Sequence, residues 1–227
     1  MPPNMPRFTL PTHGLLLLTT LLCACTQHLG RPRDTPTSQA LYGKTTLFET
    51  LPPVVYTPRD WPQALQLELL QPLTAGPHPV VLVVHGGGWR AGSRGEMRSI
   101  AQQLAKNGYA AALVSYRFSP QFLYPAPLHD LQQAVRWLND NAQQYQLNMS
   151  RLGAWGYSAG AHLVTLMALQ APPTHLPAIK AVVGGGTPVN FVDYPHSPPV
   201  RQFMGSERDD DLARWTQASP LFQVEHS

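Results

Sequence analysis

The sequence predicts an α/β fold of three layers, in which helices cover both faces of a mostly parallel sheet. Apolar runs typical of strands alternate along the chain with apolar stripes of helical spacing. The run Val80–Val84 contains no polar residue, as expected for a parallel strand that is buried on both faces. Two of the predicted strands are followed by glycine-rich stretches. Such strand and helix alternation implies right-handed crossovers.

The first half of the chain supplies two predicted strands and a helix. Leucines at alternate positions of 65–69 predict a strand with one buried face, ahead of the strand Val80–Val84. Ser93 and Glu96 have the spacing of a capping box, which starts a helix. Asn107-Gly108 is typical of a helix end. The apolar face of this helix consists of Met97, Ile100, Ala101, Leu104 and Ala105.

The second half continues the alternation. Ala110–Ser115 predicts a strand, and the next helix is recognised by an apolar stripe. A strand over 151–155 leads into a helix over 161–169, and the last predicted strand covers Ile179–Gly184. The apolar stripe of the middle helix is formed by Leu128, Leu131, Val135 and Leu138.

The run Gly156-Tyr157-Ser158-Ala159-Gly160 spells Gly-x-Ser-x-Gly between the predicted strand 151–155 and the helix 161–169. A serine that is lifted above a parallel sheet on a sharp strand-to-helix turn has strained backbone angles, so the residues two positions away must be very small. Gly156 and Gly160 meet this demand. The pattern therefore predicts Ser158 as a nucleophile.

A second glycine run, His85-Gly86-Gly87-Gly88-Trp89, directly follows the strand Val80–Val84. Ligands bind beyond the carboxyl ends of the strands in such sheets. Backbone N–H groups that no side chain obstructs can stabilise the oxyanion formed when a nucleophile attacks an ester carbonyl. A phosphate-binding loop is the rival interpretation, but the run contains neither Gly-x-x-x-x-Gly-Lys-Ser/Thr nor Gly-x-Gly-x-x-Gly.

These motifs resemble those of the α/β-hydrolase superfamily, and within it the hormone-sensitive-lipase-like and bacterial feruloyl-esterase-like carboxylesterases. The resemblance spans roughly residues 65–224. The motifs that carry it are His85-Gly86-Gly87-Gly88-Trp89, Ser115-Tyr116-Arg117, Pro125-Ala126-Pro127-Leu128-His129-Asp130 and Gly156-Tyr157-Ser158-Ala159-Gly160-Ala161-His162-Leu163.

The resemblance implies an α/β-hydrolase three-layer sandwich and a serine carboxylesterase that hydrolyses a small-molecule ester without a metal or another cofactor. It implies that Ser158 is the nucleophile. The oxyanion hole would consist of the backbone N–H groups of Gly87, Gly88 and Ala159, with Gly86 as an alternative to Gly88. The residues that support the motifs are His85, Gly86, Trp89, Gly156, Gly160 and His162. From their residue type alone, five aromatic residues are candidates for the wall of an acyl or aryl pocket, although we expect at least half of them to pack in the core: Trp89, Phe118, Phe122, Tyr124 and Tyr157.

The acidic residue and the histidine of that family follow later strands, and neither segment is recognisable in this chain. We therefore expect the last strands of the sandwich to be missing, as in a truncated or frameshifted product. Loss of the histidine of a serine hydrolase costs about 10⁶ in kcat, so a catalytically inactive remnant is the alternative hypothesis. An uncovered sheet edge at Ile179–Gly184 would favour self-association.

Other titratable residues receive structural interpretations. His162 lies four residues after the serine on the following helix, so we expect it to support neighbouring loops rather than to reach over the hydroxyl. Asp193 and His196 lie in a proline-rich segment typical of a lid or rim. The pair His129-Asp130 opens a helix, where a carboxylate favours the N-terminal dipole, and we expect both residues to pack structurally near the strand ends. His85 is expected to brace its loop.

The N-terminus predicts export. Arg7 precedes an apolar stretch, 15–22, that is too short to span a bilayer and has the length of a signal-peptide core. Leu22-Cys23-Ala24-Cys25 resembles a bacterial lipoprotein processing site, which would make Cys25 a lipid-modified first residue. By the same resemblance, Thr26 rather than Asp after Cys25 implies the periplasmic side of the outer membrane as the location within the cell envelope. A plain secreted signal is the alternative.

The chain is thus divided into a signal peptide (1–24), a flexible tether (25–40) without periodic apolar positions and a partial hydrolase domain (41–227). Both cysteines lie in the leader, so no disulfide is expected in the folded part. The formal net charge is +3 without a cluster of Lys and Arg, which argues against nucleic acid as a partner. No His-Glu-x-x-His or paired Cys-x-x-Cys pattern suggests a metal centre.

Overall fold

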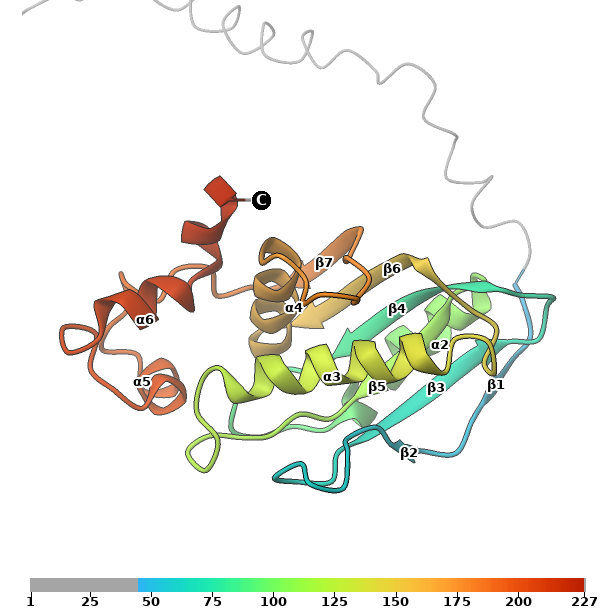
Figure 1. The fold of residues 1–227 in the computed structure, drawn as a ribbon, viewed down its shortest axis with the longest axis horizontal. Helices are drawn as coiled ribbons and strands as arrows, with labels where there is room; N and C mark the ends of the chain where they lie inside the picture. The colour runs from blue at the N-terminus through green and yellow to red at the C-terminus, as the bar shows by residue number, and fades with distance from the viewer. Residues whose placement is uncertain (1–44, 227) are drawn as a thin grey trace, which may run out of the picture. The chain divides into compact units, whose positions relative to one another are not determined.

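The computed structural model describes residues 45–226, and the predicted signal peptide, the predicted tether and Cys25 lie outside them. The described part contains a seven-stranded mixed sheet with helices packed against it (Figure 1). The strands are β1 (Phe48–Thr50), β2 (Val54–Val55), β3 (Gln66–Pro72), β4 (His78–Val84), β5 (Ala110–Val114), β6 (Leu147–Tyr157) and β7 (Ala181–Gly185). The helices are α2 (Arg98–Lys106), α3 (Ala126–Asp140), α4 (Ala159–Leu169), α5 (Pro198–Met204) and α6 (Leu212–Gln217), with 3-10 turns η1 (Arg94–Met97) and η2 (Pro220–His226).

The sheet has the strand order β1-β3-β5-β4-β6-β7, and β2 pairs with β3. Strands β5, β4, β6 and β7 are parallel, whereas β3 runs antiparallel to β5, and β1 and β2 run antiparallel to β3. The prediction of a mostly parallel sheet is confirmed. The antiparallel edge was not expected, because a period of two residues is the same in both kinds of strand.

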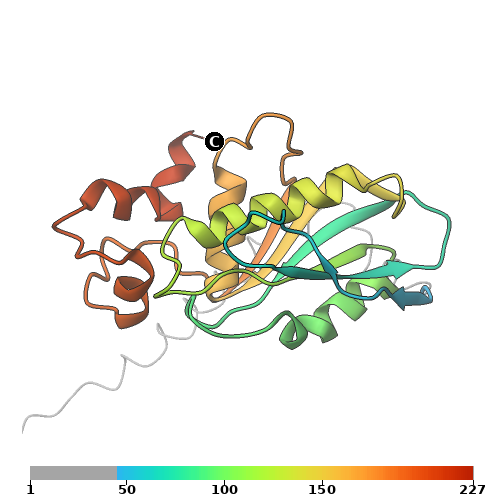
Figure 2. The same ribbon diagram turned by 60° about the horizontal axis from the view of Figure 1, so that its bottom comes forward.

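Two layers of helices enclose the sheet. Helices α3 and α4 pack on one face and α2 packs on the other, as Figures 1 and 2 show. Leu82 and Val84 of β4 belong to the core under α3 and α4, while Val83 belongs to the core under α2. Because both faces of β4 are covered, its unbroken apolar run is explained. The prediction of helices on both faces is confirmed.

The predicted elements are found with shifted ends. The capping box forms, since the Ser93 N–H donates to Glu96 Oε1 at 2.9 Å, and the helix ends ahead of Gly108, which has φ 86°. Strand β6 begins at Leu147 rather than at 151, and α4 begins at Ala159 rather than at 161. The fold is thus predicted better than the boundaries, which depend on capping and on the length of the neighbouring strand.

The prediction of one buried face for the strand 65–69 is wrong. Leu67, Glu68 and Leu69 are all buried, because both faces of β3 are covered: Leu67 and Leu69 belong to the core under α3 and α4, and Glu68 contacts α2 on the other face. The buried Glu68 carboxylate forms an ion pair with Arg98 of α2. A charged residue therefore occupies a position that the alternating pattern assigned to solvent, and its partner compensates for the burial.

Strand β7 forms the far edge of the sheet. Within residues 45–226 it pairs only with β6, and the Val183 side chain on it is 58% exposed. An apolar hollow of about 360 Å³ lies beside this edge and is lined by residues that include Val81 and Trp155. In the same part of the chain, no helix has both the length and the apolar character that crossing a bilayer requires.

Residues 186–219, which we call the cap segment, follow β7 and include α5 and α6. The cap segment packs against the loops at the carboxyl ends of the parallel strands (Figures 1 and 2). Trp89, which follows β4, stacks on Phe203 of α5 with ring centroids 4.7 Å apart. The Tyr124 N–H donates to the Phe203 carbonyl oxygen at 2.9 Å. The cap segment therefore covers the edge at which both glycine motifs lie.

Candidate active site

Ser158 occupies the turn between β6 and α4. Its backbone has φ 49° and ψ −116°, a combination that residues other than glycine rarely adopt. A Cβ atom at Gly156 would lie 2.6 Å from the carbonyl oxygen of Gly160, and a Cβ atom at Gly160 would lie 2.4 Å from the carbonyl oxygens of Val84 and His85. Only glycine fits at these two positions. The turn therefore seats α4 directly against the end of β4.

The backbone of Ser158 is held while its hydroxyl is left unbonded. The Ser158 N–H donates to the Gly185 carbonyl oxygen at 2.7 Å, and the Ser158 carbonyl oxygen accepts from the His162 N–H at 2.9 Å. The side chain makes no capping hydrogen bond to α4. No other group among residues 45–226 bonds to it. The hydroxyl is free for chemistry.

The glycine run that follows β4 lies beside this serine, because Val84 of β4 pairs with Gly156 of β6. Gly87 has φ 115°, and a Cβ atom there would lie 2.0 Å from the carbonyl oxygen of Ala91. The N–H groups of Gly87 and Gly88 find no acceptor in the described part of the chain. Unpaired N–H groups of this kind can donate to an anion.

Ser158, Gly88 and Trp89 line one cavity of about 600 Å³, and the cap segment provides its other wall. This volume lies within the range of small-molecule sites. Gly87 does not line the cavity, nor does Ala159, which is the first residue of α4. The first turn of a helix has free N–H groups, so Ala159 keeps a donor next to the serine.

The His85 side chain supports the glycine run through a hydrogen bond to its backbone. Its ring is buried and stacks on Tyr116 with centroids 4.5 Å apart, and its Nδ1 donates to the Gly86 carbonyl oxygen at 2.7 Å. The Tyr116 hydroxyl donates to the His85 carbonyl oxygen at 3.1 Å. Burial lowers the pKa of His85, so the neutral ring is favoured. His85 braces its loop, as predicted.

His162 also supports loops, as the sequence indicated. Its ring is fully buried on α4, and its two nitrogens are bonded to Trp89 and to the Ala218 carbonyl group. Both bonding positions of the imidazole are therefore used, and His162 cannot also accept the Ser158 proton.

The geometry of this site can be compared with known proteins. Residues 67–227, which make up more than half of the chain and contain both motifs, match the model of the BD-FAE family. The chain belongs to the BD-FAE family. The resemblance to bacterial feruloyl-esterase-like carboxylesterases that the motifs suggested agrees with this membership.

Individual relatives of this BD-FAE chain match shorter stretches. Carboxylesterase NlhH of Mycobacterium tuberculosis (strain CDC 1551 / Oshkosh) is 36% identical over 91 residues, which are 40% of this chain and 28% of NlhH. Esterase LipC of Mycobacterium tuberculosis (strain ATCC 25618 / H37Rv) is 29% identical over 113 residues, which are 49% of this chain and 28% of LipC. The matched stretch is thus less than a third of the length of either relative.

Solved structures share the fold of the BD-FAE chain. A bacterial heroin esterase superposes with a TM-score of 0.64 at 21% identity. The match covers 81% of this chain and 64% of the heroin esterase chain. The thermophilic carboxylesterase EstE1, which was cloned from a metagenomic library, superposes with a TM-score of 0.65 at 22% identity. The match covers 81% of this chain and 67% of EstE1. The fold is that of the α/β-hydrolases.

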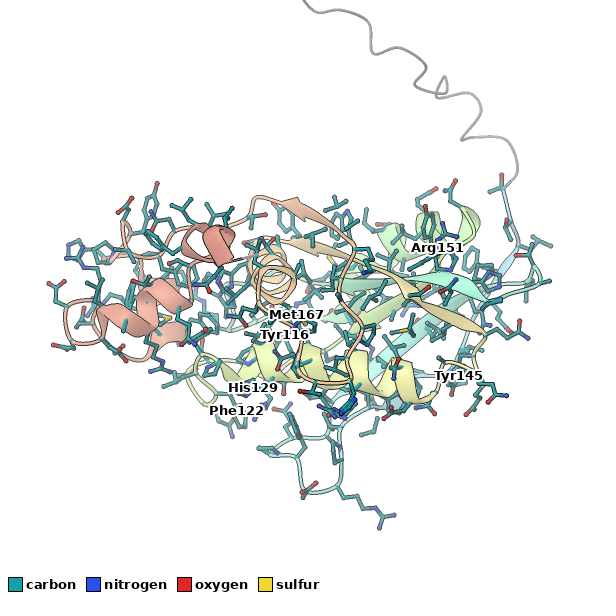
Figure 3. All side chains as sticks on the ribbon, turned by 45° about the horizontal axis from the view of Figure 1, so that its top comes forward. Tyr116, Phe122, His129, Tyr145, Arg151 and Met167 are labelled. Atoms are coloured by element: carbon teal, nitrogen blue, oxygen red, sulfur yellow. The ribbon has the colours of Figure 1, made fainter. Side chains whose placement is uncertain are left out.

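The other histidine and acid candidates of the BD-FAE chain are distributed unevenly around the site. Asp193 lines the cavity together with Ser158, and it is the charged residue among the lining side chains. Its Oδ2 accepts from Asn190 Nδ2 at 2.7 Å. His196 is exposed and does not line the cavity, and His129 is exposed on α3 (Figure 3). Of Asp193 and His196, only Asp193 lines the cavity.

Asp130 packs near the end of β5, so the predicted structural role of this residue near the strand ends is confirmed. Its side chain is completely buried and forms an ion pair with Arg117. Oδ2 accepts from the Arg117 N–H at 2.9 Å, and Oδ1 accepts from Trp61 Nε1 at 2.8 Å. The pair ties α3 to the segment after β5. Both residues lie in the motifs that carry the resemblance, but their separation along the chain gave no sign that they touch.

Of the five aromatic candidates one lines the cavity, and the core packing expected for at least half of them is confirmed for Trp89, Phe118 and Tyr124. Trp89 lines the cavity, and the other four do not. Tyr124 is buried and packs edge-on against Phe203 of α5, while Tyr157 is 56% exposed. Phe118 packs edge-on against His85. The walls of the cavity come instead from the cap segment, which the sequence described only as a lid or rim.

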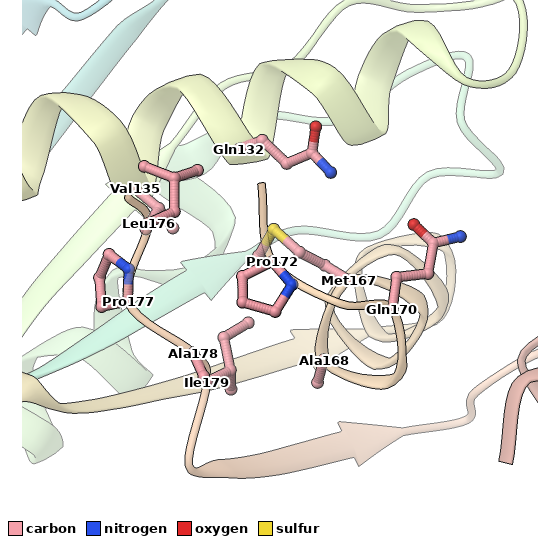
Figure 4. Close-up of a pocket in the computed structure, with 10 residues that line it drawn as sticks. All are labelled: Gln132, Val135, Met167, Ala168, Gln170, Pro172, Leu176, Pro177, Ala178 and Ile179. Carbon is pink, nitrogen blue, oxygen red and sulfur yellow. The ribbon is translucent and has the colours of Figure 1, made fainter. Parts of the chain in front are cut away.

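A second cavity, of about 30 Å³, lies between α3 and the segment 170–179 (Figure 4). Its walls include Val135, Met167 and Ile179, and none of its lining residues is ionisable. It is a packing gap and has no group for catalysis. Within the described part of the chain, no cluster of three or more His, Cys, Asp or Glu side chains is arranged to hold a metal ion.

Proposed function

We propose that this chain is a serine-dependent carboxylic ester hydrolase that forms an acyl-enzyme on Ser158. One observation carries the proposal: the unbonded Ser158 hydroxyl on a strained turn and the unpaired Gly88 N–H meet at one cavity. A strained turn that exposes a serine beside unpaired N–H groups is the arrangement that acyl transfer requires. Membership of the BD-FAE family and the esterase relatives support it.

The reaction would proceed in two halves. Ser158 Oγ attacks the ester carbonyl carbon and gives its proton to a general base, and the carbonyl oxygen becomes an oxyanion. Backbone N–H groups of Gly88 and Ala159, joined by Gly87, donate hydrogen bonds to that oxygen. The tetrahedral intermediate collapses, the protonated alcohol leaves and an acyl-Ser158 ester remains. Water then attacks this ester and releases the acid and free Ser158.

The lining of the cavity disfavours anionic substrates. Asp193 is the charged residue in its lining, so its carboxylate would repel an anionic ester but not a neutral one. We propose small or medium acyl or aryl esters, which a volume of about 600 Å³ can accommodate.

Covalent labelling of the purified full chain with a fluorophosphonate tests the proposal directly. The probe reacts with an activated serine, and peptide mass spectrometry identifies the modified residue. We expect label on Ser158 in the wild type and none in Ser158→Ala. The matched control is Ser150→Ala, which removes an exposed serine from the other end of β6 and should label normally.

Two outcomes distinguish an active hydrolase from a catalytically inactive chain. Label on Ser158 together with hydrolysis of a p-nitrophenyl ester supports the hydrolase. A chain that is folded by circular dichroism but neither labels nor hydrolyses contradicts it, and the site would then only bind ester ligands.

We further propose that the chain is anchored in the cell envelope by lipid on Cys25, in an outer membrane on the periplasmic side. The support is the run Leu22-Cys23-Ala24-Cys25 behind a short apolar stretch. Metabolic labelling with a palmitate analogue is expected to modify the wild type and Cys23→Ser but not Cys25→Ser. A wild-type chain without label would instead support a plain secreted signal.

A further inference from the structure

His162 of α4 connects two segments of the chain, the glycine run and the cap segment. Trp89 Nε1 donates to His162 Nδ1 at 3.2 Å, and His162 Nε2 lies 2.7 Å from the Ala218 carbonyl oxygen. An indole N–H can only donate and a carbonyl oxygen can only accept, so Nδ1 is the acceptor and Nε2 carries the proton. The ring must be neutral, with one tautomer, for both bonds to exist.

The first of these bonds reaches the glycine run. Trp89 directly follows Gly88 and has φ 58°, a left-handed conformation that costs free energy in a residue with a Cβ atom. Its side chain is held on three sides, by the His162 hydrogen bond, by stacking on Phe203 and by the edge of Phe191 at a centroid distance of 5.3 Å. These contacts hold the Trp89 side chain in place, directly next to Gly88.

The second bond reaches the far end of the cap segment. Ala218 is followed by Ser219, whose Oγ accepts from the Phe191 N–H at 2.9 Å and donates to the Trp215 carbonyl oxygen at 2.8 Å. The His162 ring stacks on Phe191 with centroids 4.5 Å apart. Phe191 lines the Ser158 cavity. The same imidazole therefore contacts the glycine run and the opposite wall of the cavity.

We propose that His162 is a positioning residue that fixes the glycine run and the cap segment relative to Ser158, through one ring nitrogen for each. The inference rests on the hydrolase function proposed above, since it concerns the donors of the oxyanion hole. A displacement of about 1 Å at such donors can cost about 10²-fold in rate. His162 sits one helical turn after Ser158 and is fully buried, so it is placed to transmit the position of α4 to both segments.

Two substitutions separate the two bonds. In His162→Asn the amide oxygen takes the place of Nδ1 and keeps an acceptor for Trp89, whereas the bond to Ala218 is lost. In His162→Gln the amide nitrogen takes the place of Nε2 and keeps the donor to Ala218, whereas the bond to Trp89 is lost. Trp89→Phe removes the same bond from the other side. His129→Gln, a substitution of an exposed histidine on α3, is the matched control.

We expect His162→Gln to lower kcat about tenfold more than His162→Asn does, with KM within about twofold of the wild type, because the affected donors act mainly in the transition state. Trp89→Phe should give a similar loss, and the double variant Trp89→Phe/His162→Gln should lose little more than either alone, because both remove one interaction. A purely structural role would give equal losses for Asn and Gln, and losses that add in the double variant. Either result would overturn the proposal.

Hydrogen exchange supplies a readout that needs no activity. The backbone amides of 86–92 should exchange about tenfold faster in His162→Gln and Trp89→Phe than in His129→Gln, while the amides of α3 stay unchanged. Exchange that is unchanged in 86–92, or accelerated throughout the chain, contradicts the proposal. If His162→Gln does not fold, Trp89→Phe decides in the same way. An unlabelled, inactive wild type would contradict the hydrolase function alone, since the exchange result stands without turnover.

Discussion

Burial lowers the pKa of the two histidines that support the candidate site, His85 and His162. His162 is fully buried among Trp89, Phe191 and Phe203, and this burial lowers its pKa from 6.5 to about 4. The hydrogen bond to the Ala218 carbonyl oxygen acts in the opposite direction but is the smaller cause. At neutral pH the ring is therefore uncharged, as its two hydrogen bonds require.

This shift predicts a loss of stability in acid. The folded state binds a proton at His162 only near pH 4, whereas the unfolded state binds one near pH 6.5, so the free energy of unfolding is highest above pH 6.5 and falls as the pH is lowered towards 4. The fall attributable to this residue is about 3 kcal/mol. Urea unfolding of the wild type and of His162→Asn at several pH values measures it. A difference between the two proteins that does not vary with pH would contradict the prediction.

The buried ion pair gives the second prediction at this scale. Asp130→Ala removes the acceptor of the buried Arg117 side chain and of the half-buried Trp61 indole N–H. We expect the free energy of unfolding to fall by about 3–5 kcal/mol. Urea unfolding at neutral pH checks this, and Asp140→Ala at the exposed end of the same helix is the control. Similar midpoints for the two variants would show that the pair contributes little.

At the scale of elements, the site depends on how two strands end. Strands β4 and β6 are adjacent and parallel, so the glycine run and the Ser158 turn emerge at the same edge of the sheet. The glycines are required where another segment approaches the backbone. Gly160 is in contact with the end of β4, and Gly87 is in contact with the carbonyl group of Ala91.

A substitution in the glycine run should therefore affect the reactivity of Ser158. Gly87→Ala places a Cβ atom 2.0 Å from the Ala91 carbonyl oxygen in a backbone with φ 115°, so the loop must move. We expect the rate of fluorophosphonate labelling at Ser158 to fall about 10²-fold, the cost of losing one oxyanion donor. Gly95→Ala, whose Cβ atom would find its nearest neighbour at 3.7 Å, should label like the wild type. Equal rates in all three proteins would contradict this role for the loop.

At the scale of the whole molecule, the described sheet has one edge that no other strand covers. Strand β7 pairs only with β6 within residues 45–226, and exposed apolar side chains such as Val183 lie on it. Unpaired N–H and C=O groups beside apolar side chains form a template for further strands. We therefore propose that copies of this chain associate with one another through the exposed edge strand β7.

Sedimentation velocity tests this proposal. The wild-type chain should show a sedimentation coefficient that rises with concentration, and Val183→Lys should reduce the rise because a charge on an edge strand opposes pairing. Leu73→Lys is the matched control, since Leu73 is also 58% exposed but lies beyond β3 at the other side of the sheet. A wild-type chain that stays monomeric at every concentration would refute the proposal.

The sequence by itself determined the alternation of strands and helices, the Gly-x-Ser-x-Gly turn and the glycine run after Val84. These features are local: an apolar period identifies an element, and a glycine marks a position where a side chain would clash or where φ is positive. For that reason the fold class could be predicted, and the positions of Ser158 and Gly88 at strand ends agreed with expectation.

The tertiary structure alone decided which distant residues meet. The antiparallel placement of β3, the pairing of Asp130 with Arg117 and the two bonds of His162 join segments far apart in the chain. Apolar periodicity says which side of an element is buried but not against which partner it is buried. A buried polar group takes its role from that partner, so these roles appear only when the chain is folded.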